Sequence, residues 1–332
     1  MKYLVTGGAG FIGSHMIELL IANKHKVICV DDLSTGHKSN LSSVIQKIDF
    51  YQEKIELFDF SKIQDIDGII HLAAQPSVQL SISNFANSSI SNLSGTIKII
   101  DYCRLYNVPL VYASSSAVYG NLEFGNDEIE SFDLLSPYAA DKYLMEQYSK
   151  MANKIYQLSS VGLRFFNVYG PRQDPKSPYS GVISVFTDKL LKEKNITING
   201  GYQTRDFIYV KNVVNIIYSA VNLASKNSIC EVSNVLTGES ITIDELAKKM
   251  IKIIDAKVEV KYQNLPLGDP EKSNGSSKKM TRLFNVKPDK FVKIDNGLFL
   301  TVESILGNNK SLNFFSNETN FYANKDNDQY GH

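Results

Sequence analysis

Short apolar runs alternate with segments of helical periodicity through the first half of the chain. The runs with the composition of buried strands are Lys2–Val5, Val27–Val30, Ile69–Leu72, Leu110–Ala113 and Val161–Phe165. Between them, apolar residues recur at three- and four-residue spacing, which predicts helices over Ile12–Ala22, Leu93–Tyr106 and Pro137–Met151. Apolar strands joined through helices form a parallel sheet that helices cover on both faces. The pattern therefore predicts a doubly wound α/β fold.

The pattern changes after Gly170, where Pro171, Pro175, Pro178 and Gly181 cluster. Shorter elements follow, including a helix expected over Ile243–Ile254, whose entry at Thr242 and Glu245 offers capping chemistry. We expect one domain over residues 1–170, to which some later segments return, and a smaller mixed α/β lobe over 171–306. Residues 307–332 are rich in Asn, Ser, Lys and Asp, so we expect a disordered polar tail without assigned function.

The composition agrees with a folded protein of two units. The chain has 332 residues, 43% of them hydrophobic and 21% charged, and its 35 basic side chains balance 35 acidic ones. A formal charge of zero gives no bulk attraction to nucleic acid or to an anionic membrane. We find no secretion signal and no run of about 18 apolar residues, so we expect a cytoplasmic protein without a membrane span.

Cysteine and histidine spacing favours neither disulfides nor a metal site. Cys29, Cys103 and Cys230 are odd in number and widely spaced in apolar surroundings, which is typical of reduced, buried thiols. The five histidines form no pair three or four residues apart and have no Cys at ligand spacing. We therefore expect no bound metal.

A glycine-rich segment, Gly7–Gly13, follows the first strand and reads G-x-x-G-x-x-G. Glycines at a strand–helix corner let the backbone approach a pyrophosphate, although such corners also need glycine simply for positive φ. Asp31 and Asp32 follow the second strand, where a carboxylate would bind the adenosine ribose and repel a 2′-phosphate. Asp31 could instead only begin a turn, but its pairing with the glycines favours an NAD site.

A second polar cluster contains Ser114, Ser115 and Ser116 after a strand, followed by Tyr138 and Lys142 four residues apart on one helix face. A phenol with a pKa of about 10 is a poor base at neutral pH, but a nearby ammonium and a positive nicotinamide ring favour the phenolate. Tyr138 could then take a hydroxyl proton while Ser115 holds the same oxygen. Tyr and Lys at this spacing also occur by chance. The order of the motifs favours the functional interpretation.

Together these motifs resemble the extended short-chain dehydrogenase/reductase family, from Lys2 to about Leu306. The chain is most similar to the NAD-dependent nucleotide-sugar epimerases, in particular UDP-N-acetylglucosamine and UDP-glucose 4-epimerases. The matching segments are Gly7–Gly13, Asp31–Gly36, His71–Ala74, Asn92–Thr96, Ser114–Gly120, Tyr138–Lys142, Arg164–Arg172 and Arg205–Val210. The resemblance implies a Rossmann domain, bound NAD and epimerisation through a transient 4-keto sugar. It also implies a homodimer in which Leu93–Tyr106 and Pro137–Met151 pair into a four-helix bundle.

The resemblance also implies roles for individual residues. The catalytic set is Ser115, Tyr138, which would take the C4 hydroxyl proton, and Lys142, which would bridge Tyr138 and the nicotinamide ribose. Besides Tyr138 and Lys142, the implied NAD contacts are Gly7, Gly10, Phe11, Ile12, Gly13, Asp31, Asp32, Ser34, Thr35, Gly36, Ile55, Leu72, Ala73, Ala74 and Asn92. The implied substrate contacts are Ser77, Val78, Ser115, Ser116, Asn167, Arg205 and Ser273. Asn167 would hold the diphosphate and Arg205 a phosphate, although Arg205 could instead form an ordinary ion pair.

Two positions depart from the family pattern. The family's Arg-x-Gly-Asp maps onto Pro266–Asp269, and proline cannot clamp a diphosphate. Either a cation such as Arg282 or Lys272 replaces it, or the nucleotide is not UDP. Lys54 stands where relatives have an Asp against adenine, although Ile55 can still pack on the ring. At the gate position, which matches the family, the small Ser273 resembles epimerases that admit N-acetylated sugars.

The residues after Ser115 distinguish epimerases from related lyases. Ser116 and Ala117 stand where the family's 4,6-dehydratases have Asp and Glu, and decarboxylases have Glu at the position of Ala117. Without a carboxylate there, elimination is disfavoured. Two alternatives to an epimerase stay open: a nucleotide-sugar dehydratase or other lyase of the same fold, and a noncatalytic NAD-binding regulator. The complete Ser–Tyr–Lys set argues against the regulator.

Overall fold

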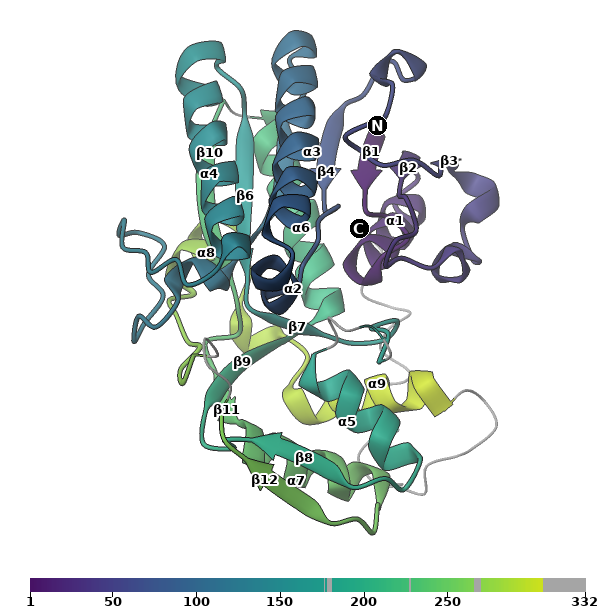
Figure 1. The fold of residues 1–332 in the computed structure, drawn as a ribbon. Helices are drawn as coiled ribbons and strands as arrows, with labels where there is room; N and C mark the ends of the chain where they lie inside the picture. The colour runs from purple at the N-terminus through teal and green to yellow at the C-terminus, as the bar shows by residue number, and fades with distance from the viewer. Residues whose placement is uncertain (176, 178–180, 227, 266–269, 307–332) are drawn as a thin grey trace.

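The computed structural model describes residues 1–175, 177, 181–226, 228–265 and 270–306 (Figure 1). Its largest sheet has seven parallel strands in the order β10-β6-β5-β4-β1-β2-β3. These strands are β1 (Lys2–Thr6), β2 (Lys26–Val30), β3 (Asp49–Tyr51), β4 (Gly68–His71), β5 (Leu110–Ser115), β6 (Ser160–Phe165) and β10 (Cys230–Val235). The predicted doubly wound α/β fold is confirmed, and the strand order reverses between β1 and β4.

Alternate residues of the strands divide between two cores. Tyr3 and Val5 of β1 pack with α1 (Phe11–Ala22), α6 (Val210–Lys226) and α8 (Lys278–Phe284) on one face of the sheet. Leu4 packs on the opposite face with α3 (Phe85–Tyr106) and α4 (Pro137–Tyr156), which stand side by side beyond the short α2 (Val78–Ser83) (Figure 1). The apolar strands of the sequence are therefore buried on both faces, as predicted.

A second, smaller group of elements lies at the carboxyl end of the large sheet (Figure 1). It contains a sheet of order β11-β9-β7 and a parallel pair, β12 with β8. Its strands are β7 (Asn167–Tyr169), β8 (Ile196–Asn199), β9 (Thr204–Tyr209), β11 (Ser240–Thr242) and β12 (Val260–Gln263), and its helices are α5 (Val182–Leu191), α7 (Ile243–Ile254) and α9 (Ile294–Leu306). α6, α8 and β10 return to the large sheet. The boundaries assigned to the two domains stay a prediction.

Most predicted elements have nearly the bounds expected of them. α7 has the predicted bounds and begins with a capping box between Thr242 and Glu245. Two helices differ more: α4 ends at Tyr156, five residues beyond the predicted end at Met151. α3 begins at Phe85, eight residues before the predicted start at Leu93. Its first half carries polar residues where the prediction required apolar ones. The predicted tail 307–332, Pro178 and the segment Pro266–Asp269 lie outside the described residues.

Three further observations limit the kinds of site that the described part of the chain offers. Cys29 and Cys103 are buried free thiols, and Cys230 is a half-buried one. No cluster of three or more possible metal ligands occurs among the described residues. Of the helices in the described ranges, none combines the length and the apolar character needed to span a bilayer.

Candidate cofactor and active site

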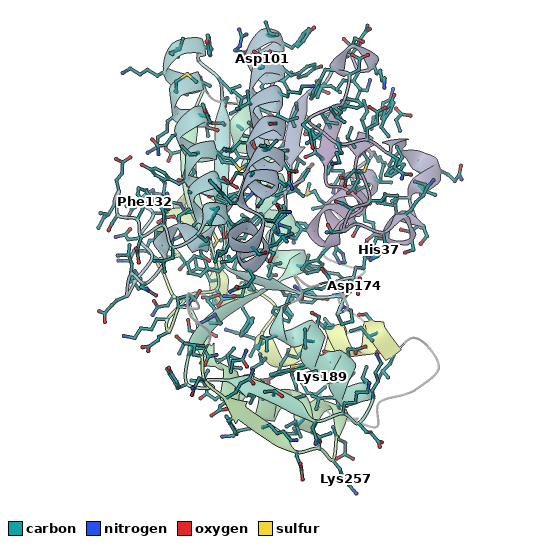
Figure 2. The ribbon with its side chains drawn as sticks, viewed as in Figure 1. His37, Asp101, Phe132, Asp174, Lys189 and Lys257 are labelled. Carbon is teal, nitrogen blue, oxygen red and sulfur yellow. The ribbon has the colours of Figure 1, made fainter. Side chains whose placement is uncertain are left out.

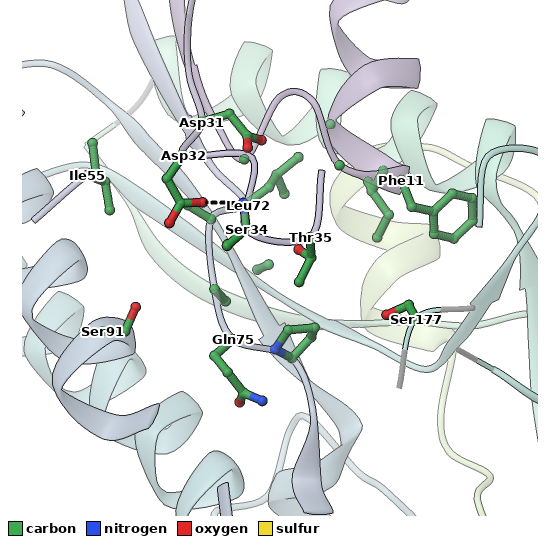
Figure 3. Close-up of a pocket in the computed structure, with 18 of the residues that line it drawn as sticks. Phe11, Asp31, Asp32, Ser34, Thr35, Ile55, Leu72, Gln75, Ser91 and Ser177 are labelled. Atoms are coloured by element: carbon green, nitrogen blue, oxygen red, sulfur yellow. Dashed lines mark hydrogen bonds between the residues drawn. The ribbon is translucent and has the colours of Figure 1, made fainter. Parts of the chain in front are cut away.

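A cavity of about 580 Å³ opens at the carboxyl ends of β1, β2, β4 and β5, where the strand order reverses. Ligands of open parallel sheets bind at this point. The predicted residues that line it are Gly7, Gly10, Phe11, Ile12, Gly13, Asp31, Asp32, Ser34, Thr35, Ile55, Leu72, Ala73, Ala74, Ser115, Tyr138 and Lys142 (Figure 3 shows part of this wall). Most of the residues that the sequence assigned to NAD, and all three assigned to catalysis, thus share one cavity.

The glycine-rich corner is too crowded for side chains. A Cβ on Gly13 would lie 2.1 Å from the carbonyl oxygen of Gly7, and one on Gly7 would lie 2.7 Å from the backbone nitrogen of Ala73. Gly7 also has a φ of +69°, which favours glycine. Because α1 starts directly at this corner, its free N–H groups face the cavity and fit an anionic diphosphate. The corner is therefore a backbone cradle suited to NAD.

The two aspartates after β2 have different environments. Asp31 is buried, and its carboxylate accepts hydrogen bonds from the backbone nitrogens of Ala9 (2.8 Å) and Leu33 (2.8 Å). It therefore braces the turn as well as lining the cavity, and burial raises its pKa. Asp32 is more exposed and accepts from the backbone nitrogen of Ser34 at 2.9 Å (dashed in Figure 3). Its other carboxylate oxygen can accept from a ribose hydroxyl.

The structure brings Ser115, Tyr138 and Lys142 together at the inner end of the cavity. Tyr138 lies in the first turn of α4, and its hydroxyl hydrogen-bonds to Ser115 at the end of β5. The Nζ of Lys142 donates to the carbonyl oxygen of Ala113 at 2.7 Å and lies 5.7 Å from the centroid of the Tyr138 ring. Lys142 is only 2% exposed. The ammonium is therefore held by β5 close to the phenol.

Burial and the charge of Asp141 oppose each other in their effect on the pKa of Lys142, whereas both raise the pKa of Tyr138. Burial raises the pKa of Tyr138, and the hydrogen bond with Ser115 lowers it. Burial lowers the pKa of Lys142 to about 8, although the carboxylates of Asp141 and Glu146 act to raise it. Lys142 is thus still largely protonated at neutral pH but titrates not far above it.

His71, from the predicted His71–Ala74 segment, is neutral and links the wall to the sheet. Burial and the charge of Lys142 lower its pKa to about 3. Its Nδ1 and Nε2 lie 2.7 Å from Oγ1 of Thr6 and 3.2 Å from Oγ1 of Thr96. Since Thr96 already donates to the carbonyl oxygen of Asn92, the network assigns the ring proton to Nε2. The chain of hydrogen bonds fixes β4 against α3.

Several predicted contacts do not line the cavity: Gly36, Ser77, Val78, Asn92, Ser116, Asn167, Arg205 and Ser273. Asn92 lies behind the wall, where its amide accepts from the backbone nitrogen of Gln75 (2.8 Å) and donates to Asp141 (3.0 Å). Ser77 caps α2 by accepting from the backbone nitrogen of Leu80. Asn92 and Ser77 therefore brace the wall, and the ligand contacts expected of them stay a prediction.

Three of the residues predicted for the sugar nucleotide, Asn167, Arg205 and Ser273, lie in the smaller lobe. The amide of Asn167 donates to the carbonyl oxygen of Asp206 (3.0 Å) and to Oγ of Ser273 (3.4 Å), which joins two predicted substrate residues. Arg205 is 9% exposed and donates to the carbonyl oxygen of Thr204. Of the two cations considered as replacements at Pro266, Lys272 pairs with Glu123 and Arg282 pairs with Glu128. Both are held towards the loop after η4 (Ser116–Tyr119).

Among the wall residues missed from the sequence, two groups each come from one continuous segment. Asn84, Asn87, Ser88 and Ser91 form a polar face on the first half of α3, and Ser91 projects towards the cavity (Figure 3). Their three- and four-residue spacing was a helical signal, but it carries no apolar stripe. This is why the prediction began α3 too late.

The second missed group is a strap, residues 171–175, that lies against the large domain, and its Arg172, Gln173 and Asp174 line the cavity. Arg172 donates to Glu18 at 2.6 Å, and His15 donates to the carbonyl oxygen of Pro171 at 3.0 Å. His37 lies 3.1 Å from Asp174 (both labelled in Figure 2). The strap thereby closes the cavity beside the glycine-rich corner.

Comparisons with known proteins agree with this geometry. The model of the NAD dependent epimerase/dehydratase family matches residues 3–235. A putative UDP-glucose 4-epimerase of Methanocaldococcus jannaschii is 41% identical over 247 residues, which cover 73% of this chain and 79% of that protein. The solved UDP-N-acetylglucosamine 4-epimerase of Methanobrevibacter ruminantium, in complex with UDP-N-acetylmuramic acid, has a TM-score of 0.86 and 35% identity, with 92% of this chain and 98% of that chain covered.

A third relative was solved with the cofactor. The UDP-glucose 4-epimerase of Thermus thermophilus, in complex with NAD, has a TM-score of 0.82 and 33% identity, with 93% of this chain and 100% of that chain covered. The family match spans the glycine-rich corner, the serine cluster and the Tyr–Lys helix. The chain belongs to the NAD-dependent epimerase/dehydratase family.

Proposed function

We propose that the protein is an NAD-dependent 4-epimerase of UDP-hexoses, with UDP-N-acetylglucosamine and UDP-N-acetylgalactosamine as its preferred pair and UDP-glucose and UDP-galactose as the second. The observation that carries this proposal is the meeting of Ser115, Tyr138 and Lys142 in one cavity with the glycine-rich corner. The solved relatives named above act on UDP-N-acetylglucosamine and UDP-glucose, which supports the same substrate class here.

Each catalytic side chain has a separate task in this reaction. NAD, when bound, supplies a hydride acceptor that takes the hydrogen from C4 and later returns it to the opposite face of the sugar. Tyr138 takes the proton of the C4 hydroxyl as the C4–O bond becomes a carbonyl, and gives it back when the hydride returns. Ser115 donates a hydrogen bond to the same oxygen. The ammonium of Lys142, 5.7 Å from the centroid of the Tyr138 ring, would favour the phenolate that forms when Tyr138 is deprotonated.

The charges along the cavity favour epimerisation over elimination. The carboxylates of the described residues that line it are Asp31, Asp32, Glu53, Glu56 and Asp174, none of which follows β5 or lies on α4. Elimination of water from the sugar needs an acid and a base beside the catalytic hydroxyl. A hexosamine 5,6-dehydratase with 24% identity and a TM-score of 0.82 shares the fold alone. The dehydratase therefore stays the second candidate.

The substrate preference rests on Asn167 and Ser273. Their contact at 3.4 Å joins the strand after Phe166 to the segment after the predicted diphosphate motif. A serine hydroxyl at this position leaves room for an N-acetyl group that a larger side chain would occupy. If Asn167 turned from Ser273 to the substrate, its amide would still donate to the carbonyl oxygen of Asp206.

The enzyme would act as a homodimer through α3 and α4. Leu144, Tyr148, Met151 and Ile155 are exposed on α4 at spacings of four, three and four residues, which is a continuous helical stripe. Ile90 and Ile97 are exposed on the adjacent α3. Two helices with such stripes bury them when paired across a two-fold axis. Light scattering of the purified protein would give twice the chain mass, and a monomer would contradict this part of the proposal.

The activity is tested by incubating the purified protein separately with UDP-N-acetylglucosamine and UDP-glucose and separating the products. We expect the C4 epimer of at least the first, and epimer formation about 10²–10⁴-fold slower in the Y138F variant. A 4-keto-6-deoxy product would instead identify a lyase. If both proteins bind NAD and neither interconverts any sugar nucleotide, the noncatalytic alternative is favoured.

A further inference from the structure

α4 carries two buried carboxylates beside the catalytic pair, and they have different partners. Glu146 is fully buried and makes two hydrogen bonds with the guanidinium of Arg164, at 2.8 and 2.7 Å, and accepts a third from Ser114 at 2.6 Å. Its charge is thereby neutralised by a cation in direct contact. Asp141 is 2% exposed and accepts from the amide of Asn92 at 3.0 Å. An amide leaves its negative charge uncompensated.

Lys142 is the buried cation next to Asp141. Within the described ranges, the ion pairs of 4.0 Å or less include none to Lys142, whose Nζ donates to a backbone carbonyl. From the other elements packed against the pair, β4 presents the neutral His71 and β6 presents Arg164, which is bound to Glu146. α2 presents the uncharged Ser81, and α3 the uncharged Asn92. Among these groups, Asp141 is therefore the carboxylate that acts on Lys142 without a cation bound to it directly.

We propose that Asp141 is a positioning residue that sets the protonation balance of Tyr138 and Lys142 and, through Asn92, holds the Gln75 wall of the cavity. The proposal rests on the proposed epimerase function, because it concerns the base of that reaction. The wall contact is direct: Asn92 donates to Asp141 with its amide nitrogen and accepts from the backbone nitrogen of Gln75 with its oxygen. Gln75 lines the cavity.

The sign of the charge effect follows from Coulomb's law. A carboxylate favours the ammonium form of Lys142 and disfavours the phenolate form of Tyr138, so it raises the pKa of both groups. Removal of the charge lowers both pKa values. The acidic limb of a pH–rate profile, where Tyr138 ionises, and the alkaline limb, where Lys142 loses its proton, therefore both move to lower pH.

The test is the near-isosteric D141N variant, which can keep the hydrogen bond from Asn92 while losing the charge. Tyrosinate absorbance is titrated in NAD-loaded protein, and the contribution of Tyr138 is obtained by subtracting the titration of a matching Y138F protein. We expect the Tyr138 pKa in D141N to fall by about one unit, the order expected for loss of one nearby charge. Both limbs of the pH–rate profile should move in the same direction.

Two control variants separate charge from scaffold. D101N removes a carboxylate that is exposed on α3 and paired with Arg104, and should leave the Tyr138 titration unchanged. N92S breaks the wall contact without removing charge, so it should weaken NAD retention without shifting the titration. An unshifted Tyr138 in D141N, or an equal shift in D101N or N92S, would overturn the proposal.

The titration needs no turnover. If the protein epimerises no sugar nucleotide and D141N still lowers the pKa of Tyr138, the proposed function fails while the role of Asp141 in charge balance stands. If the protein epimerises its substrate and D141N leaves the titration and the pH profile unchanged, the proposed function stands and the proposed role of Asp141 fails.

Discussion

The two ends of the active-site region are built by different means. At the dinucleotide end, backbone approaches backbone so closely that a Cβ on Gly13 would lie 2.1 Å from the carbonyl oxygen of Gly7. At the sugar end, polar side chains such as Asn167 and Ser273 bond to each other. The glycine-rich corner therefore has almost no room for added side-chain atoms. If the proposed sugar contacts hold, the Asn167–Ser273 hydrogen bond can be replaced by one to the substrate without altering the fold.

The largest effect is expected where the two ends meet, at Tyr138. Y138F removes the group that carries the proton, and kcat should fall by about 10²–10⁴-fold, the usual contribution of a general acid–base group. NAD binding and the melting temperature should change little. The matched control is Y143F, because Tyr143 lies on the same helix but packs on Phe132, with ring centroids 4.6 Å apart. Equal losses in both variants would mean that α4, not the phenol, was disturbed.

The next effect concerns the buried ion pair that supports the catalytic end. Glu146→Gln leaves Arg164 charged and buried, so the free energy of unfolding should fall by about 3–5 kcal/mol in chemical denaturation. Glu130→Gln breaks a solvent-exposed pair with Lys150 and should leave the free energy of unfolding nearly unchanged, because water screens exposed ion pairs. Equally small losses in the free energy of unfolding in both variants would show that the Glu146–Arg164 ion pair does not stabilise the catalytic end.

A smaller effect is expected at the dinucleotide end. Gly13→Ala introduces a Cβ 2.1 Å from a backbone oxygen, and should lower the free energy of unfolding by about 1–3 kcal/mol and release NAD on gel filtration. Gly181→Ala is the control, because the nearest atom to its Cβ is the end of the Gln173 side chain, at 3.2 Å. Retention of NAD by the Gly13 variant would refute the backbone cradle.

The smallest effect on the fold is expected at the sugar end. Ser273→Tyr should lower kcat/KM for UDP-N-acetylglucosamine about tenfold or more relative to UDP-glucose, because a filled pocket rejects the added acetyl group. Its melting temperature should stay close to that of the parent protein. Comparison of both substrates in both proteins measures this ratio. An unchanged ratio would mean that Ser273 does not face the sugar.

The difference between local motifs and contacts between distant segments explains which parts of the candidate site could be predicted from the sequence. The glycine-rich corner and the pair Tyr138 and Lys142 are local motifs, so their spacing predicted a shared cavity that the fold contains. The strap at Arg172 and the polar face at Ser91 depend on contacts between distant segments and carry no apolar period. Asn92 was expected to contact the ligand directly, but only the folded chain places it between Gln75 and Asp141.

The central claim is that hydrogen leaves C4 as a hydride and returns to the same carbon while Tyr138 moves the proton. The most direct test follows UDP-N-acetylglucosamine that carries deuterium at C4 through the reaction in ordinary water, with mass spectrometry of both epimers. We predict that the epimer formed keeps its deuterium at C4. Loss of the label to water, or its appearance elsewhere in a 4-keto-6-deoxy product, would contradict the account.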